Sequence, residues 1–299
     1  MPGRMYVQIP AYRDRELVPT VADLLRTATH PDRLRVAIAW QHDAREAPLE
    51  SALRRLGPVE LTKIPAARSQ GCNWARHLLQ QRWDGEPYTL FLDSHHRFVA
   101  GWDEQVIGLF EALRGAGIRK PILTGYLPPY DPANDPAGRV EAIYRMDVAE
   151  RQRQMVFRLT GHAIRGWRRL ASPVPARFAS LHFLFAAGSF NEEVPFDPAV
   201  YFFADEVAIA LRAYSRGYDL FHPHKMLGWH LYDRATRVTH WDDHPAWRAQ
   251  NDRSFERLRA LFSGSLGGPY GLGTARTVAD YETFAGLRLM GSGSRTCAS

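Results

Sequence analysis

The most restrictive feature of this chain is a regular alternation of extended and helical segments over its first 125 residues. Apolar runs that predict strands lie at 5–9, 35–41, 59–64, 88–92 and 121–126, and apolar residues with helical spacing lie at 17–28, 72–81 and 102–114. Such alternation is typical of a mostly parallel sheet covered by helices. We therefore expect an α/β fold with a mostly parallel central sheet.

The second half of the chain is less regular. Residues 127–136 (LPPYDPANDP) contain four prolines, and between them and Pro175 only 155–159 predicts a strand, among arginine-rich loops. Strands are predicted again at 181–187 and 218–221, and helices at 205–215 and 247–262. We expect one compact domain with two halves, 1–126 and 127–290, followed by a disordered tail at 291–299.

An acidic residue and two histidines directly follow the apolar run 88–92 (YTLFL), which is typical of a central strand covered on both faces. In open parallel sheets the ligand crevice lies beyond the carboxyl ends of the strands. Residues two apart in an extended chain point the same way, so Asp93 and His95 can converge on one ion. A carboxylate with an imidazole suits Mn²⁺, with Mg²⁺ as the alternative. Without a metal, Asp93 would cap the following turn.

Four sequence blocks resemble, in matching order, the polypeptide and Skp1-type N-acetylglucosaminyltransferases. They are VQIPAYRDREL, YTLFLDSHHRFVAGWD with the family's D-S-H metal motif, EVPFDPAVYFFADE, and GYDLFHPHKMLGWHLYDR. The third block ends in Ala204-Asp205-Glu206 where the family usually has G-E-E, so both acids are kept and the glycine is lost. The fourth places His230 where the family has its last metal ligand. Residues 127–180 show no such resemblance.

The resemblance implies a GT-A glycosyltransferase fold and a UDP-sugar donor, in particular UDP-N-acetylglucosamine. It also implies transfer, with retention of anomeric configuration, to a hydroxyl of a peptide or protein. Asp93, His95 and His230 would hold a divalent cation, which stabilises the negative charge of a diphosphate leaving group.

The same resemblance assigns residues to the donor. Arg76 matches a family A-R pair and is expected to place positive charge near the donor, together with Ser94 of the metal motif. Tyr12 and Arg13, at the end of the first strand, are expected beside the uracil ring. The alternatives are that Arg76 lies on a helix surface and that Tyr12 only packs against a helix.

Asp205 and Glu206 are assigned to catalysis, and Glu206 is the preferred residue for binding the acceptor or orienting its hydroxyl. Alternatively, both acids only charge the first turn of the following helix, where the helix dipole favours carboxylates. A separate zinc site at His222, His224 and His230 is another hypothesis, although its H-x-H-x5-H spacing lacks an obvious fourth ligand.

Large aromatic residues leave a further choice open. Trp102, Trp229 and Trp241 are either platforms for a sugar or, as large aromatic residues more often are, part of the core.

Composition limits the partners. The net charge of +6 is compatible with an anionic ligand, but the basic residues are scattered and no nucleic-acid motif occurs, so we expect no nucleic-acid partner. The start of the chain does not resemble a signal peptide, and no run of about 18 apolar residues occurs. With only Cys72 and Cys297, a disulfide framework is not expected. We expect a cytoplasmic protein without a membrane partner.

Three alternative functions remain at this stage. The same donor chemistry could serve a glycan, a lipid or a small natural product, because acceptor loops differ more than donor sites. The chain could instead bind nucleotide sugars without catalysis, although Asp93, His95 and His230 argue against a lost metal site. A nucleotidyltransferase is disfavoured, because the opening strand lacks a glycine-rich phosphate loop.

Overall fold

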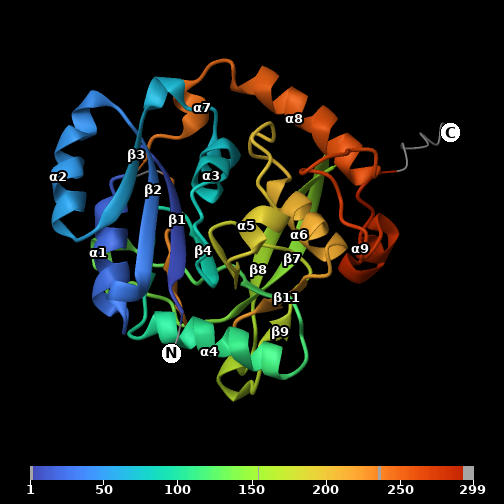
Figure 1. The fold of residues 1–299 in the computed structure, drawn as a ribbon, viewed down its shortest axis with the longest axis horizontal. Coiled ribbons are helices and arrows are strands. Elements are labelled where there is room, and N and C mark those ends of the chain that lie inside the picture. Colours follow the sequence, from blue (N-terminus) through green and yellow to red (C-terminus); the bar gives the residue numbers. More distant parts are fainter. Residues whose placement is uncertain (1–2, 154, 235–236, 292–299) are drawn as a thin grey trace.

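The computed structural model describes residues 3–153, 155–234 and 237–291. Within these residues a central sheet of eight strands is covered by helices on both faces (Figure 1). The expected tail 291–299 falls, beyond Gly291, outside the described residues.

Most strands of the central sheet run parallel. In spatial order they are β3 (Val59–Pro65), β2 (Leu34–His42), β1 (Met5–Tyr12), β4 (Tyr88–Leu92), β10 (Phe183–Ala187), β6 (Pro121–Thr124), β11 (Asp219–His222) and β9 (Val174–Pro175). The first four strands in this order, β3, β2, β1 and β4, pair in parallel, as do β6 and β11. Strands β10 and β9 are antiparallel to their neighbours. The expected α/β fold with a mostly parallel sheet is confirmed.

Helices cover the two faces in separate groups. One face carries α1 (Leu17–Thr27), α2 (Ala47–Arg55) and α4 (Trp102–Gly115), and the other carries α3 (Cys72–Gln80), α5 (Phe190–Glu193), α6 (Asp205–Ser215), α8 (Trp247–Phe262) and α9 (Val278–Ala285). Strand β4 shows why both faces must be covered. Its Leu90 and Leu92 pack on the first group and Phe91 on the second, as the two-residue period of a strand requires.

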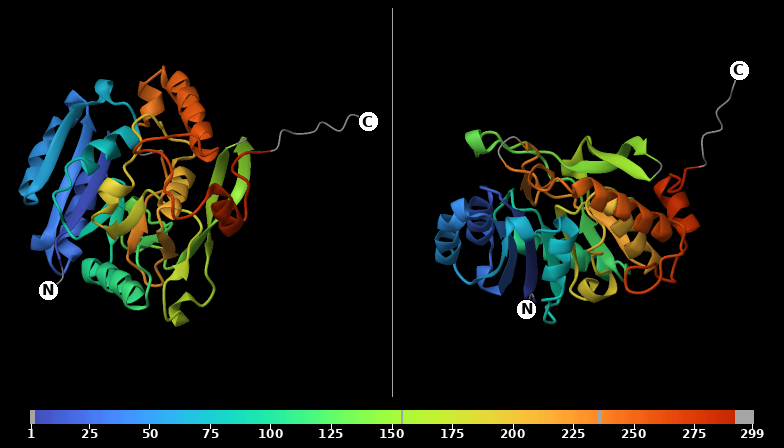
Figure 2. Two further views of the ribbon diagram at one scale, coloured as in Figure 1. Left: turned by 45° about the vertical axis from the view of Figure 1, so that its right-hand side comes forward. Right: turned by 90° about the horizontal axis from the view of Figure 1, so that it is seen from above.

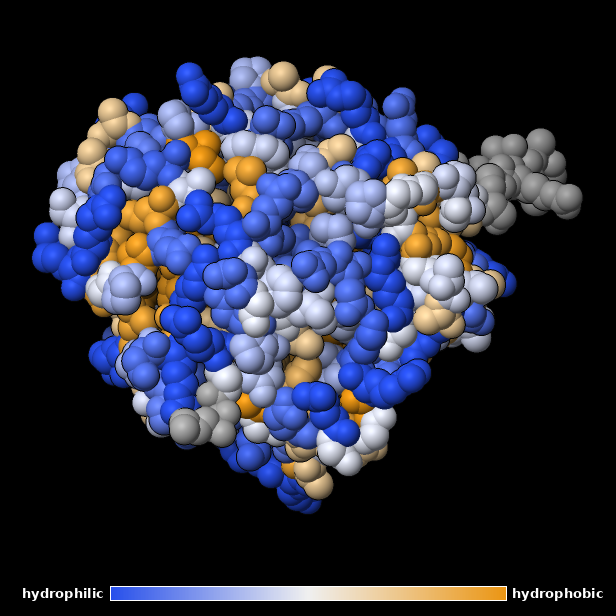
Figure 3. Space-filling view, viewed as in Figure 1, coloured by the Kyte–Doolittle hydropathy of each residue, from blue (hydrophilic) through white to orange (hydrophobic). Residues whose placement is uncertain are grey.

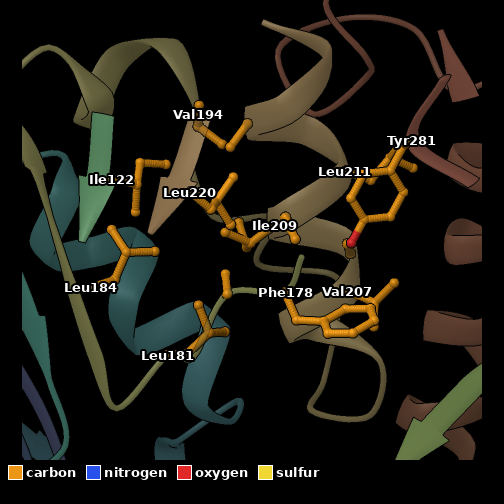
Figure 4. Close-up of a cluster of buried hydrophobic side chains, with 14 of the residues drawn as sticks. Ile122, Phe178, Leu181, Leu184, Val194, Val207, Ile209, Leu211, Leu220 and Tyr281 are labelled. Atoms are coloured by element: carbon orange, nitrogen blue, oxygen red, sulfur yellow. The ribbon is translucent and has the colours of Figure 1, made fainter. Parts of the chain in front are cut away.

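Helix α6 is anchored to the sheet by an apolar face. Figure 4 shows Ile209 of this helix directed toward side chains from β6, β10 and β11, whereas Val207 lies beside Phe178 and Leu211 beside Tyr281. Fully burying an aliphatic side chain of this size contributes about 1.5–3 kcal/mol. The anchoring therefore fixes the N-terminal end of α6, where Asp205 and Glu206 lie.

A long antiparallel hairpin was not predicted. Strands β7 (Tyr144–Arg153) and β8 (Val156–Ala163) pair with each other as a separate two-stranded sheet (Figure 2), so the expectation of one strand among loops was wrong. The sequence of β7 is mostly polar and charged, and its register is interrupted between Val148 and Glu150. These features remove the regular alternation by which a strand is recognised.

Four helices were also missed by the sequence analysis: the single turns α5 and α7 (His240–Asp243), and the longer helices α2 and α9. Helix α2 is short, and in it only Leu53 is buried. Helix α9 begins with a capping box in which the Thr277 hydroxyl accepts from the Asp280 amide and the Asp280 carboxylate accepts from the Thr277 amide. This signal was present in the sequence.

No helix among the described residues is long and apolar enough to cross a membrane. On the face seen in Figure 3, hydrophobic residues form separate patches among hydrophilic ones.

Candidate active site

A small two-stranded sheet brings together residues that are far apart in the sequence. Strand β5 (His96–Phe98) pairs antiparallel with β12 (Gly228–His230), and His96 lies opposite His230. A Cβ atom at Gly228 would lie 2.3 Å from the carbonyl oxygen of Arg97, so the close approach of these strands requires glycine. The pairing places His230 beside the segment that follows β4.

Asp93, His95 and His230 converge at this point. One ligand atom from each residue lies within 4.8 Å of the other two. In the described part of the chain, these three residues form a group that could hold a metal ion. Oδ2 of Asp93 lies 3.8 Å from Nε2 of His95 and 3.6 Å from Nε2 of His230, too far for hydrogen bonds but suited to ligands around one cation.

The two imidazoles fit such a cation. Nε2 of His95 and both ring nitrogens of His230 are buried and lack a hydrogen-bond partner in the described residues. Burial lowers the pKa of His230 well below its usual value, so its ring is neutral, as a metal ligand must be. Buried polar atoms are normally paired, and a cation between Asp93 and the Nε2 atoms of the two rings would satisfy these two nitrogens.

Asp14 orients His95 from behind. Its Oδ2 accepts hydrogen bonds from Nδ1 of His95 and from the Ser94 hydroxyl, both at 2.6 Å, and its Oδ1 accepts from the Glu16 amide at 2.9 Å. Burial opposes ionisation, but these hydrogen bonds lower the pKa of Asp14. Histidines that ligate metals commonly have such a carboxylate partner. Sequence reasoning assigned Asp14 no role and expected Ser94 at the donor.

His182 supports His230 from the other side. The two rings stack with centroids 4.0 Å apart and planes 17° apart. Nε2 of His182 accepts from the Leu127 amide at 3.1 Å, and Nδ1 lies 3.0 Å from the Ser180 hydroxyl, so the ring is held at both nitrogens. A histidine inside a predicted strand gave no sequence signal for this role.

Arg76 lies in the interior beside the metal ligands. Its Nη2 donates to Oδ1 of Asp93 at 3.0 Å, and its Nη1 lies 3.6 Å from Oδ2 of Asp205. The side chain is 4% exposed, so the alternative of a surface residue is wrong. Burial alone would raise the pKa of Asp93, but nearby His230 and the charge of Arg76 keep it well below its usual value.

Asp205 and Glu206 begin α6 at the edge of the same space. Asp205 accepts from the Asn73 amide at 3.2 Å, and Glu206 accepts from the Tyr126 hydroxyl at 3.0 Å. Burial raises the pKa of Asp205 to about 6, and burial together with the nearby charge of Asp205 raises the pKa of Glu206 to about 8. Glu206 is therefore mostly protonated at neutral pH and suited to positioning a hydroxyl.

Ala204 precedes these acids with φ +65°, in the left-handed region where the resembling family has glycine. An alanine in this conformation is strained, whereas glycine adopts it freely.

Tyr12 and Arg13 are joined to a segment after β12. The Tyr12 hydroxyl and Nη1 of Arg13 both donate to Oδ2 of Asp243, at 2.7 and 2.6 Å, and Asp243 belongs to the short helix α7 (His240–Asp243). Tyr12 also packs edge-on against His240, with centroids 5.0 Å apart. Arg13 has φ 45°, a strained conformation of the kind found at functional sites.

A cavity of about 580 Å³ connects most of these groups, although Arg13 does not line it. Its lining includes Tyr12, Arg76, Asp93, Ser94, His95, Asp205, Glu206 and His230. Arg234 and Arg237, which sequence reasoning did not single out, line it too, and Nη1 of Arg237 is buried without a hydrogen-bond partner in the residues described. The cavity therefore combines a candidate cation site with guanidinium groups suited to phosphate oxygens.

The hypothesis of a separate zinc site at His222, His224 and His230 is not supported by the positions of these residues. Nδ1 of His222 lies 2.9 Å from the Thr124 carbonyl oxygen and Nε2 accepts from the Met146 amide, so both ring nitrogens are engaged. The metal-binding group found in the described residues contains His230 with Asp93 and His95, without His222 or His224.

The three tryptophans have different surroundings. Trp102 and Trp229 are buried, and their indole nitrogens donate to the carbonyl oxygens of Leu24 and Val140. Trp241 lines the large cavity.

Comparison with known proteins identifies the class. The family model described as Glycosyltransferase (GlcNAc) matches residues 4–56 and 49–290, so this chain belongs to that glycosyltransferase family. No curated protein matches the chain at a significant level.

Solved structures confirm the fold. S. aureus TarS 1–349 is 10% identical with a TM-score of 0.56, covering 94% of this chain and 69% of that one. TarS 1–349 in complex with UDP-GlcNAc gives the same identity and score. GalNAc-T7 with UDP, GalNAc and Mn²⁺ is 13% identical with a TM-score of 0.61, covering 96% of this chain and 55% of that one. The protein is a glycosyltransferase with the GT-A fold.

Proposed function

We propose that this protein transfers N-acetylglucosamine from UDP-N-acetylglucosamine to a hydroxyl of a peptide or protein, with retention of anomeric configuration and with the help of a divalent cation. The observation that carries the proposal is that the buried, unpaired Nε2 atoms of His95 and His230 lie around Oδ2 of Asp93. Residues 1–126 would bind the donor, and 127–290 would complete the metal site and bind the acceptor.

The ligand set suits Mn²⁺, with Mg²⁺ as the alternative, because it combines one carboxylate with two imidazoles. A cation held by three protein groups keeps positions open for the two phosphates, and bound there it would stabilise the charge of the departing diphosphate. The structure of GalNAc-T7, which shares the fold, was determined with UDP and Mn²⁺.

The donor would lie along the cavity from α7 to the metal ligands. Arg234 and Arg237 line that path and can neutralise phosphate oxygens, while Arg76 holds Asp93 in place. Tyr12 and Arg13 would contact the uracil ring at the end of β1. UDP-GlcNAc as the donor agrees with the description of the family and with the UDP-GlcNAc complex of TarS.

The acceptor hydroxyl would be positioned by Glu206, with Asp205 as the second acid. Glu206 accepts a hydrogen bond from Tyr126, and Asp205 contacts Asn73 and Arg76, so both acids are held in place at the cavity. The proposed step uses no nucleophile from the protein. In the proposed step the acceptor oxygen bonds to the anomeric carbon while the bond from that carbon to the phosphate oxygen breaks. The proton of the hydroxyl passes to the departing phosphate.

The test measures release of UDP from UDP-GlcNAc, with and without Mn²⁺, for wild type, Asp93→Ala and the exposed control Asp32→Ala. We expect metal-dependent release of UDP by wild type and by Asp32→Ala. In Asp93→Ala the rate of release should fall by at least about 100-fold, because removing a group that stabilises charge in the transition state typically costs this much. Binding of the donor without any turnover would indicate a non-catalytic nucleotide-sugar-binding protein instead.

Acceptor class and stereochemistry are tested next. Labelled donor is offered with serine peptides, oligosaccharides, lipids and small hydroxyl compounds, and the product is examined by NMR. Labelled peptide with an α-linkage supports the proposal. Labelling only of another class of acceptor contradicts the proposed peptide acceptor. A β-linkage contradicts the proposed retention of anomeric configuration.

A further inference from the structure

Arg97 lies in the middle of β5, opposite Trp229 of β12, and its side chain is 9% exposed. Its guanidinium contacts three separate segments of the chain. Nη2 donates to Oε2 of Glu16 at 2.7 Å, Nη1 donates to the Tyr130 hydroxyl at 3.1 Å, and Nε donates to Oδ2 of Asp135 at 3.1 Å. The proposed transfer step assigns no role to any of these groups.

Glu16 connects this cluster to one of the proposed metal ligands. The amide of Glu16 donates to Oδ1 of Asp14 at 2.9 Å, and Oδ2 of the same carboxylate accepts from Nδ1 of His95 at 2.6 Å. Movement of the segment 14–16 would therefore alter the orientation of the His95 ring.

Tyr130 belongs to the loop that holds the other histidine ligand. The carbonyl oxygen of Pro128 accepts from the His230 amide at 2.9 Å. The Leu127 amide donates to Nε2 of His182, whose ring stacks on that of His230. This loop therefore contacts both the backbone of the ligand and, through His182, its ring.

The two connections meet at the Tyr130 hydroxyl, which accepts from Arg97 and donates to Oε2 of Glu16 at 3.0 Å. Tyr130 is 4% exposed, and the guanidinium carbon of Arg97 lies 4.7 Å from the centroid of its ring. A guanidinium presents its N–H groups in a rigid planar fork, so the groups that it binds are fixed relative to one another. Hydrogen bonds with an ionised partner are also stronger than those between neutral groups.

We propose that Arg97 is a positioning residue of the metal site, which fixes the placement of His95 relative to His230. It does so by holding Glu16 and Tyr130 in one cluster. This inference rests on the proposed function, because it presupposes a cation between the two histidines. Groups that orient metal ligands without touching the metal commonly determine how tightly the metal binds. Arg97 would contribute geometry and not charge, since a nearby positive charge by itself disfavours a cation.

The test measures Mn²⁺ affinity by calorimetry in the presence of UDP for wild type, Arg97→Met and Arg35→Met. Arg35 is the matched control, because it also contacts two carboxylates, those of Glu60 and Glu86, but lies near the start of β2 and outside the cavity lining. Charge alone predicts tighter binding in Arg97→Met, because a positive charge is removed and two carboxylates lose their partner. We expect binding about tenfold weaker instead, at the lower end of the usual loss when such an orienting group is removed. Arg35→Met should keep the wild-type affinity.

Tyr130→Phe provides a second variant, which keeps the ring and removes only the shared hydroxyl. It should weaken Mn²⁺ binding by about three- to tenfold, the contribution of one net hydrogen bond. If Arg97→Met does not fold, this variant decides.

Unchanged or tighter binding in Arg97→Met overturns the inference, as does unchanged binding in Tyr130→Phe. An equal loss in Arg35→Met overturns it too, because the effect would then be one of general destabilisation. Failure of wild type to bind Mn²⁺ is a different result, because it overturns the proposed metal site itself.

Discussion

Oδ2 of Asp14 lies 2.6 Å from Nδ1 of His95, and this contact leaves Nε2 of His95 as the ring nitrogen that faces Asp93. The tautomer and the ring orientation of a proposed metal ligand are thus set by a carboxylate on the segment after β1. Asp14, Arg76 and His182, from three separate parts of the chain, thus support the proposed metal ligands.

Asp14→Asn is expected to weaken metal binding by about 10- to 100-fold, the usual cost of removing such a partner. An amide can donate to Nδ1 and so favour the wrong tautomer. Mn²⁺ affinity is measured by calorimetry in the presence of UDP. Asp32→Ala, which changes an exposed carboxylate outside the cavity, is the control and should bind Mn²⁺ like wild type. Equal affinities in Asp14→Asn and wild type would show that the contact does not support the metal.

Ala204→Gly is expected to raise the free energy of unfolding by about 0.5–1 kcal/mol, because glycine adopts φ +65° without strain. The greater freedom of glycine in the unfolded chain offsets part of this gain. Urea denaturation measures the change. Ala112→Gly, at an exposed position inside α4, should instead lower stability by about 1 kcal/mol. The account of strain fails if both substitutions are destabilising.

Glu206 should make stability depend on pH. Its pKa is raised from 4.5 to about 8, so the folded state binds more protons than the unfolded state between these values. This group therefore favours folding at low pH, and its contribution declines as pH rises from about 4.5 to about 8. Urea denaturation across this window should show a steeper decline in wild type than in Glu206→Gln, which keeps an acceptor for Tyr126. Parallel curves would mean that Glu206 ionises at its ordinary pKa.

Arg76→Met should destabilise the protein by about 3–5 kcal/mol, the cost of removing one partner from a buried ion pair. Asp93 and Asp205 would lose the charge that faces both. Arg55→Met, which alters an exposed arginine of α2, should change stability by less than about 0.5 kcal/mol. Similar unfolding free energies for the two variants would contradict the structural role of Arg76.

The central parallel strands could be predicted because their apolar runs are buried on both faces, as Leu90, Phe91 and Leu92 illustrate. The hairpin could not, because β7 is mostly polar, with only a few apolar residues such as Met146 packed on the core. Its partner β8 was recognised only over its first residues. Local periodicity indicates a strand only where a sheet has a regularly buried face.

The candidate site was predictable in part. The resemblance singled out Asp93, His95 and His230, and the structure brings them together. The supporting residues Asp14 and His182 act through contacts between segments distant in sequence, which local spacing does not reveal. Arg237 became a candidate only because the structure places it in the cavity lining, with Nη1 buried and unpaired among the described residues.

The most direct test of the account is the affinity of UDP measured by calorimetry with and without Mn²⁺, in wild type and in Asp93→Ala. If Asp93, His95 and His230 hold a cation that binds the diphosphate, wild type should bind UDP at least about tenfold more tightly with Mn²⁺, a coupling of about 1.4 kcal/mol. Asp93→Ala should lose this difference. Equal affinity of wild type for UDP with and without the metal would contradict the central claim.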